Sequence, residues 1–136
     1  MTRAQMRLPD DERTVVRLKD LVECFCKEHG VPRTLSDVVM LSLDEIVSNI
    51  ILHGYGGRAG QLSIALNLDG RAFSVVIEDA GKPFDVTKAV APVTGCTLVS
   101  RREGGLGLLL VKNLMDEITY QRAGAINRLT LVKRLR

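Results

Sequence analysis

The chain has 136 residues, 46% of them hydrophobic and 26% charged, with a formal net charge of +3. A chain of this length buries roughly two-thirds of its unfolded surface, so we expect a single domain, residues 1–136. The small net charge, with no single basic tract, argues against direct binding of nucleic acid. The longest apolar run, Val38 to Leu43, is far too short to span a membrane, and we expect no membrane contact.

The cysteines predict the cellular compartment. Cys24, Cys26 and Cys96 form an odd set, and the first ten residues hold no apolar export signal. We therefore expect a reducing compartment, the cytoplasm. Cys24 and Cys26 are two residues apart on a predicted helix and should point to different faces, which argues against a metal site there.

Two helices are predicted first in chain order. The acidic segment 9–12 is typical of a helix start, and apolar residues then recur at helical spacing up to a stop at His29-Gly30, namely Val15, Leu18, Leu21, Val22 and Phe25. A second helix should cover residues 35–52 and end at Gly54. Thr34 and Asp37 have the spacing of a capping box at its start.

The period then changes to alternation, which predicts strands. Residues 62–68 and 73–77 should form a hairpin through Asp69-Gly70, and residues 86–102 have no clear period. A third helix at 106–115 and two short strands at 117–122 and 126–135 complete the order. This order predicts an α+β two-layer sandwich, in which three helices cover one face of a mainly antiparallel sheet of four to five strands.

The second helix carries a polar stripe. Glu45, Ser48 and Asn49 are three or four residues apart and share one face of an otherwise apolar helix. A carboxylate and an amide on a buried helix destabilise the fold unless they are paired or face a wet cavity. Helical spacing alone supports a solvent-facing stripe and a functional site equally.

Two further segments suit a ligand. Residues 79–85 follow a strand and contain Asp79 and Gly81, and alone they would be read as a turn. Residues 104–107, Gly104-Gly105-Leu106-Gly107, open the third helix. Glycines at a helix N-terminus let an anion such as phosphate approach free backbone N–H groups, although glycine loops also merely cap helices.

In this order, the three segments resemble those of the Bergerat-fold ATPases. Glu45-x-x-x-Asn49 is similar to the N-box, Asp79-x-Gly81 to the first glycine box and Gly105-x-Gly107 to the second. The chain most resembles the RsbW-type anti-sigma factor serine/threonine kinases, through residues 44–49 with His53-Gly54-Tyr55, residues 79–85, residues 104–107 and Met115-Asp116-Glu117. The resemblance spans about residue 34 to the C-terminus.

The resemblance implies ATP and Mg²⁺ as cofactors and a role for each motif. Asn49 would be a Mg²⁺ ligand, Glu45 the general base, and Asp79 the acceptor for the adenine amino group, with Gly81 beside the ring. The loop Gly104, Gly105, Leu106 and Gly107 would hold the phosphates. Residues 82–102 would form a lid, whose Lys82, Arg101 and Arg102 are candidates to neutralise phosphate charge.

The implied function is a kinase that sequesters a sigma factor and phosphorylates a small STAS-type antagonist protein. Homodimers are common in that family, so a homodimer is one expected state. One departure is Glu103, an acidic group beside the phosphate loop, which favours the alternative of a nucleotide-gated regulator without phosphotransfer. A detached histidine-kinase catalytic domain is disfavoured, because no helix pair bears a phosphoacceptor histidine. An interaction module that binds no nucleotide is a further alternative.

Overall fold

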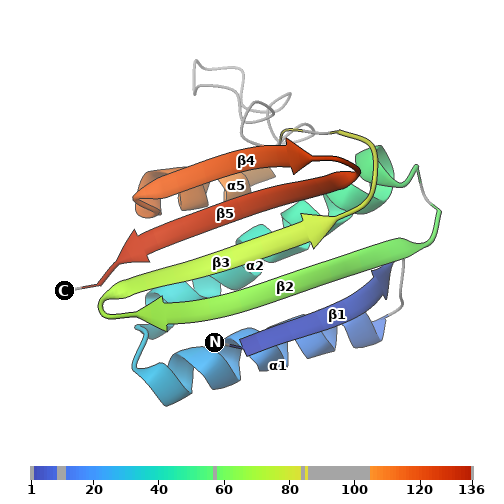
Figure 1. Ribbon diagram of the computed structural model, residues 1–136. Coiled ribbons are helices and arrows are strands. Elements are labelled where there is room, and N and C mark those ends of the chain that lie inside the picture. The colour runs from blue at the N-terminus through green and yellow to red at the C-terminus, as the bar shows by residue number, and fades with distance from the viewer. Residues whose placement is uncertain (1, 9–11, 57, 84, 86–104, 136) are drawn as a thin grey trace.

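A five-stranded antiparallel sheet with helices on one face makes up the described part of the protein (Figure 1). The structure, a computed structural model, describes residues 2–8, 12–56, 58–83, 85 and 105–135. The sheet order is β1-β2-β3-β5-β4, which confirms the predicted two-layer α+β sandwich. The elements in chain order are β1 (Thr2–Leu8), α1 (Glu12–His29), α2 (Arg33–Asn49), the π-helix η1 (Ile50–Gly54), β2 (Gly60–Asp69), β3 (Ala72–Asp79), α5 (Gly105–Leu114), β4 (Glu117–Ala123) and β5 (Ile126–Arg134).

The alternating pattern of β2 and β3 builds the core face of the sheet. Leu62, Ile64 and Leu66 are buried, and the register pairs Ile64 with Ile77. Gly70 has a φ of 62° in the connecting turn, a conformation that glycine adopts without a steric cost. The predicted hairpin is therefore confirmed, and this face packs against α1 and α2.

Strand β1 is an element that the sequence analysis did not predict. It pairs antiparallel with β2, with Ala4 opposite Ile64, and forms one edge of the sheet. The signal was present but weak: small or apolar residues at 4, 6 and 8 alternate with Arg3, Gln5 and Arg7. A seven-residue strand with only three such positions is hard to distinguish from a polar terminus until its partner strand is known.

Helix α2 begins two residues earlier than expected, at Arg33. The predicted capping box does not form: Thr34 lies inside the first turn, and no side chain caps the helix. Instead, the carbonyl of Pro32 accepts hydrogen bonds from the N–H groups of Leu35 and Ser36, both at 3.1 Å. Pro32 is thus the N-cap residue, and its carbonyl begins the hydrogen-bond pattern of the helix.

Helix α2 is only partly buried. It lies between α1 and α5 in the helix layer (Figure 1), and it buries Val39, Leu43 and Ile46 completely. Leu41, however, is 44% exposed, so this largely apolar helix is not buried on all sides. A helix in the outer layer of a two-layer fold keeps one face toward solvent. Glu45 and Asn49 are half-buried at the margin of that face.

The last turn of the predicted second helix is a π-helix rather than an α-helix. In η1 the N–H of Tyr55 donates to the carbonyl of Ile50 at 2.9 Å, a bond that spans five residues. Such turns are rare in proteins overall, but those that occur are often found at functional sites. In Figure 1, η1 and the end of β3 lie at the same end of the sheet.

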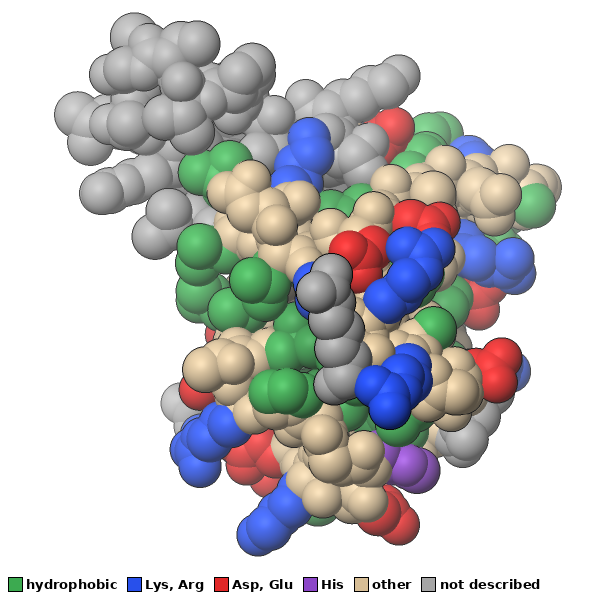
Figure 2. Space-filling view, turned by 90° about the vertical axis from the view of Figure 1, so that its left-hand side faces the viewer, with side chains coloured by type: hydrophobic (Ala, Val, Ile, Leu, Met, Phe, Trp, Pro, Cys, Tyr) green, Lys and Arg blue, Asp and Glu red, His purple; other side chains and the backbone are tan. Residues whose placement is uncertain are grey.

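Charged side chains of both signs are interspersed on the face shown in Figure 2, which looks at the molecule from the end where the β2–β3 hairpin lies. Two ion pairs join neighbouring strands of the sheet. Arg128 contacts Glu78 and Arg134 contacts Glu117, each at 2.8 Å. Because these pairs are largely exposed to water, each contributes little to stability.

Candidate functional site

Asp79 is a nearly buried carboxylate at the end of β3. It continues the inward-facing series Phe73, Val75 and Ile77, and only 8% of its surface is exposed. Its Oδ1 atom accepts hydrogen bonds from the N–H of Gly81 at 2.9 Å and from Nδ2 of Asn127 at 3.0 Å. Within the described residues, no hydrogen bond reaches Oδ2. A buried acceptor without a partner destabilises the fold, so this oxygen suits a ligand that donates a hydrogen bond.

A small cavity lies against this carboxylate, between the helix layer and the sheet. Its other walls come from Ile46 and Ile50 on one side and from Ile77 and Leu129 on the other, with Tyr120 and Asn127 beside Asp79. Apolar walls with one polar edge suit a flat heterocycle. The volume is about 20 Å³, room for about one water molecule, so a purine requires the cavity to widen.

Position 81 requires glycine because the turn after β3 packs directly on η1. A Cβ atom at Gly81 would lie 2.6–2.8 Å from the backbone of Gly54. The N–H of Lys82 also donates to the carbonyl of Gly54 at 2.7 Å. The π-turn therefore joins the end of α2 to the turn that carries Asp79.

Replacement of Gly81 by alanine should destabilise the protein by about 1–3 kcal/mol, because the new methyl group meets backbone that has no room to move. Chemical denaturation of the two proteins measures this difference. Lys82→Ala is the matched control in the same turn: its side chain is exposed and its backbone bond to Gly54 is kept. Equal stability of Gly81→Ala and wild type would contradict the close packing of this turn on η1.

Tyr55, which follows η1, holds the same turn from a second direction. Its hydroxyl accepts a hydrogen bond from the N–H of Ala80 at 2.8 Å and donates to the carbonyl of Gln61 at 2.6 Å. Burial raises the pKa of Tyr55, which keeps the phenol protonated as a donor. The resemblance included Tyr55 without a role, and the structure shows this one.

Asn127 was missed by the sequence analysis. It is 4% exposed, and its Nδ2 donates to Oδ1 of Asp79 at 3.0 Å and to the carbonyls of Gly81 and Lys82 at 3.1 Å. A signal existed in the sequence: Asn127 shares the inward register of β5 with Leu129 and Leu131, where an amide is exceptional. What it binds could not be read from β5 alone.

Glu45 and Asn49 lie one turn apart on α2, both half-buried, and α2 packs against α5. Asn49 directly precedes η1, so it lies at the end of α2 that leads to the Asp79 turn. Ser48, the third member of the stripe, is exposed and donates to the carbonyl of Asp44 at 2.9 Å. Its hydroxyl is therefore satisfied by its own helix.

The phosphate loop is described only in part. Gly105, Leu106 and Gly107 form the first turn of α5, close to the predicted start of the third helix. Gly104 lies outside the described residues, as do Arg101, Arg102, Glu103 and the lid residues 86–102. Lys82 is described, and its side chain is exposed. Among the described residues no three His, Cys, Asp or Glu side chains are grouped to hold a metal ion.

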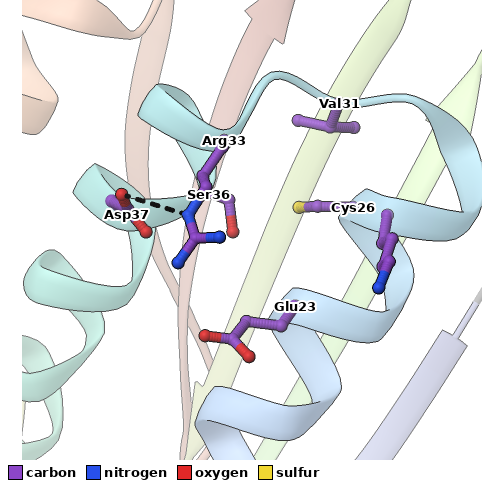
Figure 3. Close-up of a pocket in the computed structure, with 7 residues that line it drawn as sticks. Glu23, Cys26, Val31, Arg33, Ser36 and Asp37 are labelled. Atoms are coloured by element: carbon purple, nitrogen blue, oxygen red, sulfur yellow. Dashed lines mark ion pairs between the residues drawn. The ribbon is translucent and has the colours of Figure 1, made fainter.

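A second and larger cavity lies between α1 and the first turn of α2 (Figure 3). Its volume is about 310 Å³, and its lining residues are Glu23, Cys26, Lys27, Val31, Arg33, Ser36 and Asp37. Burial raises the pKa of the Cys26 thiol, whereas Cys24 is exposed, so the two cysteines do point to different faces. This cavity is at the opposite end of α2 from Asn49 and contains none of the predicted site residues.

Comparisons with known proteins identify the family. The model of the family "Histidine kinase-like ATPase domain" matches residues 8–133. Serine/threonine-protein kinase BtrW of Bordetella bronchiseptica is 34% identical over 92 residues, which are 67% of this chain and 65% of BtrW. Serine-protein kinase RsbW of Staphylococcus epidermidis is 28% identical over 127 residues, 88% of this chain and 80% of RsbW. The anti-sigma F factor of a Thermoanaerobacter species is 28% identical over 96 residues, 68% of this chain and 66% of that protein.

Solved structures share the fold at low sequence identity. The blue-light activated histidine kinase of Erythrobacter litoralis EL346 matches with a TM-score of 0.56 and 20% identity, over 76% of this chain and 31% of that protein. The structure of its histidine kinase domain matches with a TM-score of 0.58 and 17% identity, over 89% of this chain and 60% of that chain. With the family model matching nearly the whole sequence, this chain belongs to the histidine kinase-like ATPase domain family.

Proposed function

We propose that this protein binds Mg-ATP and is an anti-sigma factor serine/threonine kinase. The observation that carries the proposal is the Asp79 site: a buried carboxylate with one oxygen unpaired within the described residues, at the edge of an apolar cavity between α2 and the sheet. Such an oxygen suits the amino group of adenine. The names of BtrW, RsbW and the anti-sigma F factor support the kinase activity and the regulatory role.

The remaining site residues would act on the triphosphate. Asn49 would offer a carbonyl oxygen to Mg²⁺, a hard ion that keeps several waters and binds phosphate oxygens, so a cluster of acidic side chains is not required. The backbone N–H groups of Gly104, Gly105, Leu106 and Gly107 would bind phosphate at the start of α5. Glu45, one turn before Asn49, would accept the proton of the attacking hydroxyl.

The partners follow from the same proposal. They are a sigma factor, which the protein would sequester, and a STAS-type antagonist protein, which it would phosphorylate. We also propose that the protein forms a homodimer, that it is located in the cytoplasm and that residues 1–136 make up a single domain. None of the helices in the described ranges is long and apolar enough to cross a membrane.

The alternative is a nucleotide-gated regulator that binds ATP and partners but transfers no phosphate. Glu103 favours it, because a carboxylate next to the phosphate loop repels a triphosphate. The two functions share the Asp79 site and differ in what Glu45 does.

Removal of the Asn49 amide should weaken the binding of Mg-ATP and leave metal-free ATP nearly unaffected. Calorimetric titration of wild type and Asn49→Ala with ATP, with and without Mg²⁺, measures both affinities. Ser48→Ala is the matched control, because its hydroxyl is exposed and bonded within its own helix. If the gain in affinity from Mg²⁺ is the same in Asn49→Ala and wild type, Asn49 is not a metal ligand. If wild type binds no ATP in either condition, the proposed function is wrong.

A further inference from the structure

Three side chains of the β4–β5 hairpin form a hydrogen-bonded group beside the turn that carries Asp79. They are Tyr120 and Arg122 on β4 and Asn127 on β5, and we call them the hairpin triad. The cross-strand register places Arg122 opposite Asn127. Arg122 reaches the turn directly, because its Nη1 donates to the carbonyl of Gly81 at 2.8 Å.

The triad fixes which way the Asn127 amide points. Its Oδ1 accepts hydrogen bonds from the hydroxyl of Tyr120 and from Nη1 of Arg122, the latter at 3.0 Å. The guanidinium of Arg122 can only donate, and on the other side Nδ2 faces only acceptors: Oδ1 of Asp79 and the carbonyls of Gly81 and Lys82. A flipped amide would turn its NH₂ group toward the guanidinium and its oxygen toward a carboxylate and two carbonyls, so the observed orientation is favoured.

The fixed amide in turn fixes the carboxylate of Asp79. Oδ1 receives two donors from different directions, Nδ2 of Asn127 and the N–H of Gly81, which together oppose rotation of the carboxylate. The oxygen with no bond from the described residues, Oδ2, is thereby held in one position. A purine with an amino group at position 6 can donate to an oxygen held there, whereas a purine with an oxygen at that position cannot.

We propose that Asn127, locked by Tyr120 and Arg122, is the positioning residue that makes this site selective for 6-aminopurines. It acts through Asp79 and does not itself contact the base. This inference rests on the proposed ATP binding and adds the element that sets base selectivity: a hairpin more than forty residues further along the chain than the turn it holds.

The test compares ATP with ITP, which carries an oxygen in place of the 6-amino group. The readout is the ratio of the two dissociation constants, measured by calorimetry on the full chain, since a general loss of stability does not change base preference. Asn127→Ala should reduce the preference for ATP at least about tenfold. The reason is that the adenine amino group then loses its well-placed hydrogen bond to the charged Asp79 carboxylate.

A second variant covers the case in which Asn127→Ala does not fold. Tyr120→Phe/Arg122→Ala leaves Asn127 in place but removes both donors to its Oδ1, so the amide is held only through Nδ2 and is less firmly fixed. Its preference for ATP should fall in the same direction. Arg128→Ala is the matched control: Arg128 is adjacent to Asn127 on β5, but its side chain pairs with Glu78 on the other face of the sheet. Its base preference should equal that of wild type.

The outcomes separate this inference from the proposed function. If wild type prefers ATP and the folded variants keep the full preference, the triad only stabilises the turn and the inference is overturned while the proposed function stands. If wild type binds neither nucleotide, the proposed function fails and this inference fails with it. If selectivity falls in the triad variants and not in Arg128→Ala, the inference is supported.

Discussion

Replacement of Glu45 by glutamine should lower phosphate transfer from ATP to the antagonist protein by about 10²–10⁴-fold. A positioned general base contributes that factor, which is roughly 3–5 kcal/mol of the barrier. Glutamine keeps the size of the side chain and its place on α2, one turn from Asn49, but cannot accept the proton. Folding and the affinity for Mg-ATP should therefore change little. Transfer is measured with labelled ATP and the candidate antagonist proteins of the same genome.

Asp44→Asn is the matched control for this experiment. Asp44 is the adjacent acidic residue on α2, but its side chain lies on the exposed face of the helix. Partial burial raises the pKa of Asp44, which means that its charged form is slightly disfavoured in the folded protein. The loss of this charge should therefore not destabilise the protein. Transfer by Asp44→Asn should equal that of wild type. A wild type that binds Mg-ATP but phosphorylates no candidate, with Glu45→Gln indistinguishable from it, would exclude the kinase and leave the nucleotide-gated regulator.

Asp79→Asn should lower the affinity for ATP by about 10- to 150-fold. This is the equivalent of about 1.5–3 kcal/mol for a hydrogen bond to a charged group. The asparagine oxygen can still accept from Gly81 and Asn127, so the turn should keep its structure. Its NH₂ group then takes the place of Oδ2 and opposes the adenine amino group. ITP, with an oxygen at position 6, should lose much less affinity than ATP. Calorimetry with both nucleotides measures this change in base preference.

Glu78→Gln provides the comparison for Asp79→Asn. Glu78 is the preceding residue of β3, and its side chain lies on the opposite face of the sheet, where it pairs with Arg128. The affinity of the Glu78→Gln variant for both nucleotides should match that of wild type. Wild type with equal affinity for ATP and ITP would show that Asp79 does not read the amino group. In that case the buried carboxylate would serve only to hold the turn.

The sequence alone determined those features that depend on local periodicity and on the order of motifs. The alternation of residues 62–68, the turn at Gly70 and the helical spacing in residues 15–25 each lie within one segment. The sandwich and the order of its elements after β1 could therefore be predicted. The order of Glu45, Asn49, Asp79 and the glycine loop indicated the family in the same way. The roles of Glu45 and Asn49 remain predictions.

Only the tertiary structure decided how the Asp79 turn is held. Asn127 is 48 residues from Asp79, and Arg122 is 41 residues from Gly81. Their contacts depend on the register of β5 against β3, in which Asp79 faces Asn127. A shift of one residue would turn Asn127 to the other face of the sheet. The need for glycine at 81 likewise depends on the backbone of Gly54, and the edge strand β1 on the partner that it finds in β2. Such contacts join segments whose separate patterns contain no record of one another, because register and packing are properties of the folded chain as a whole.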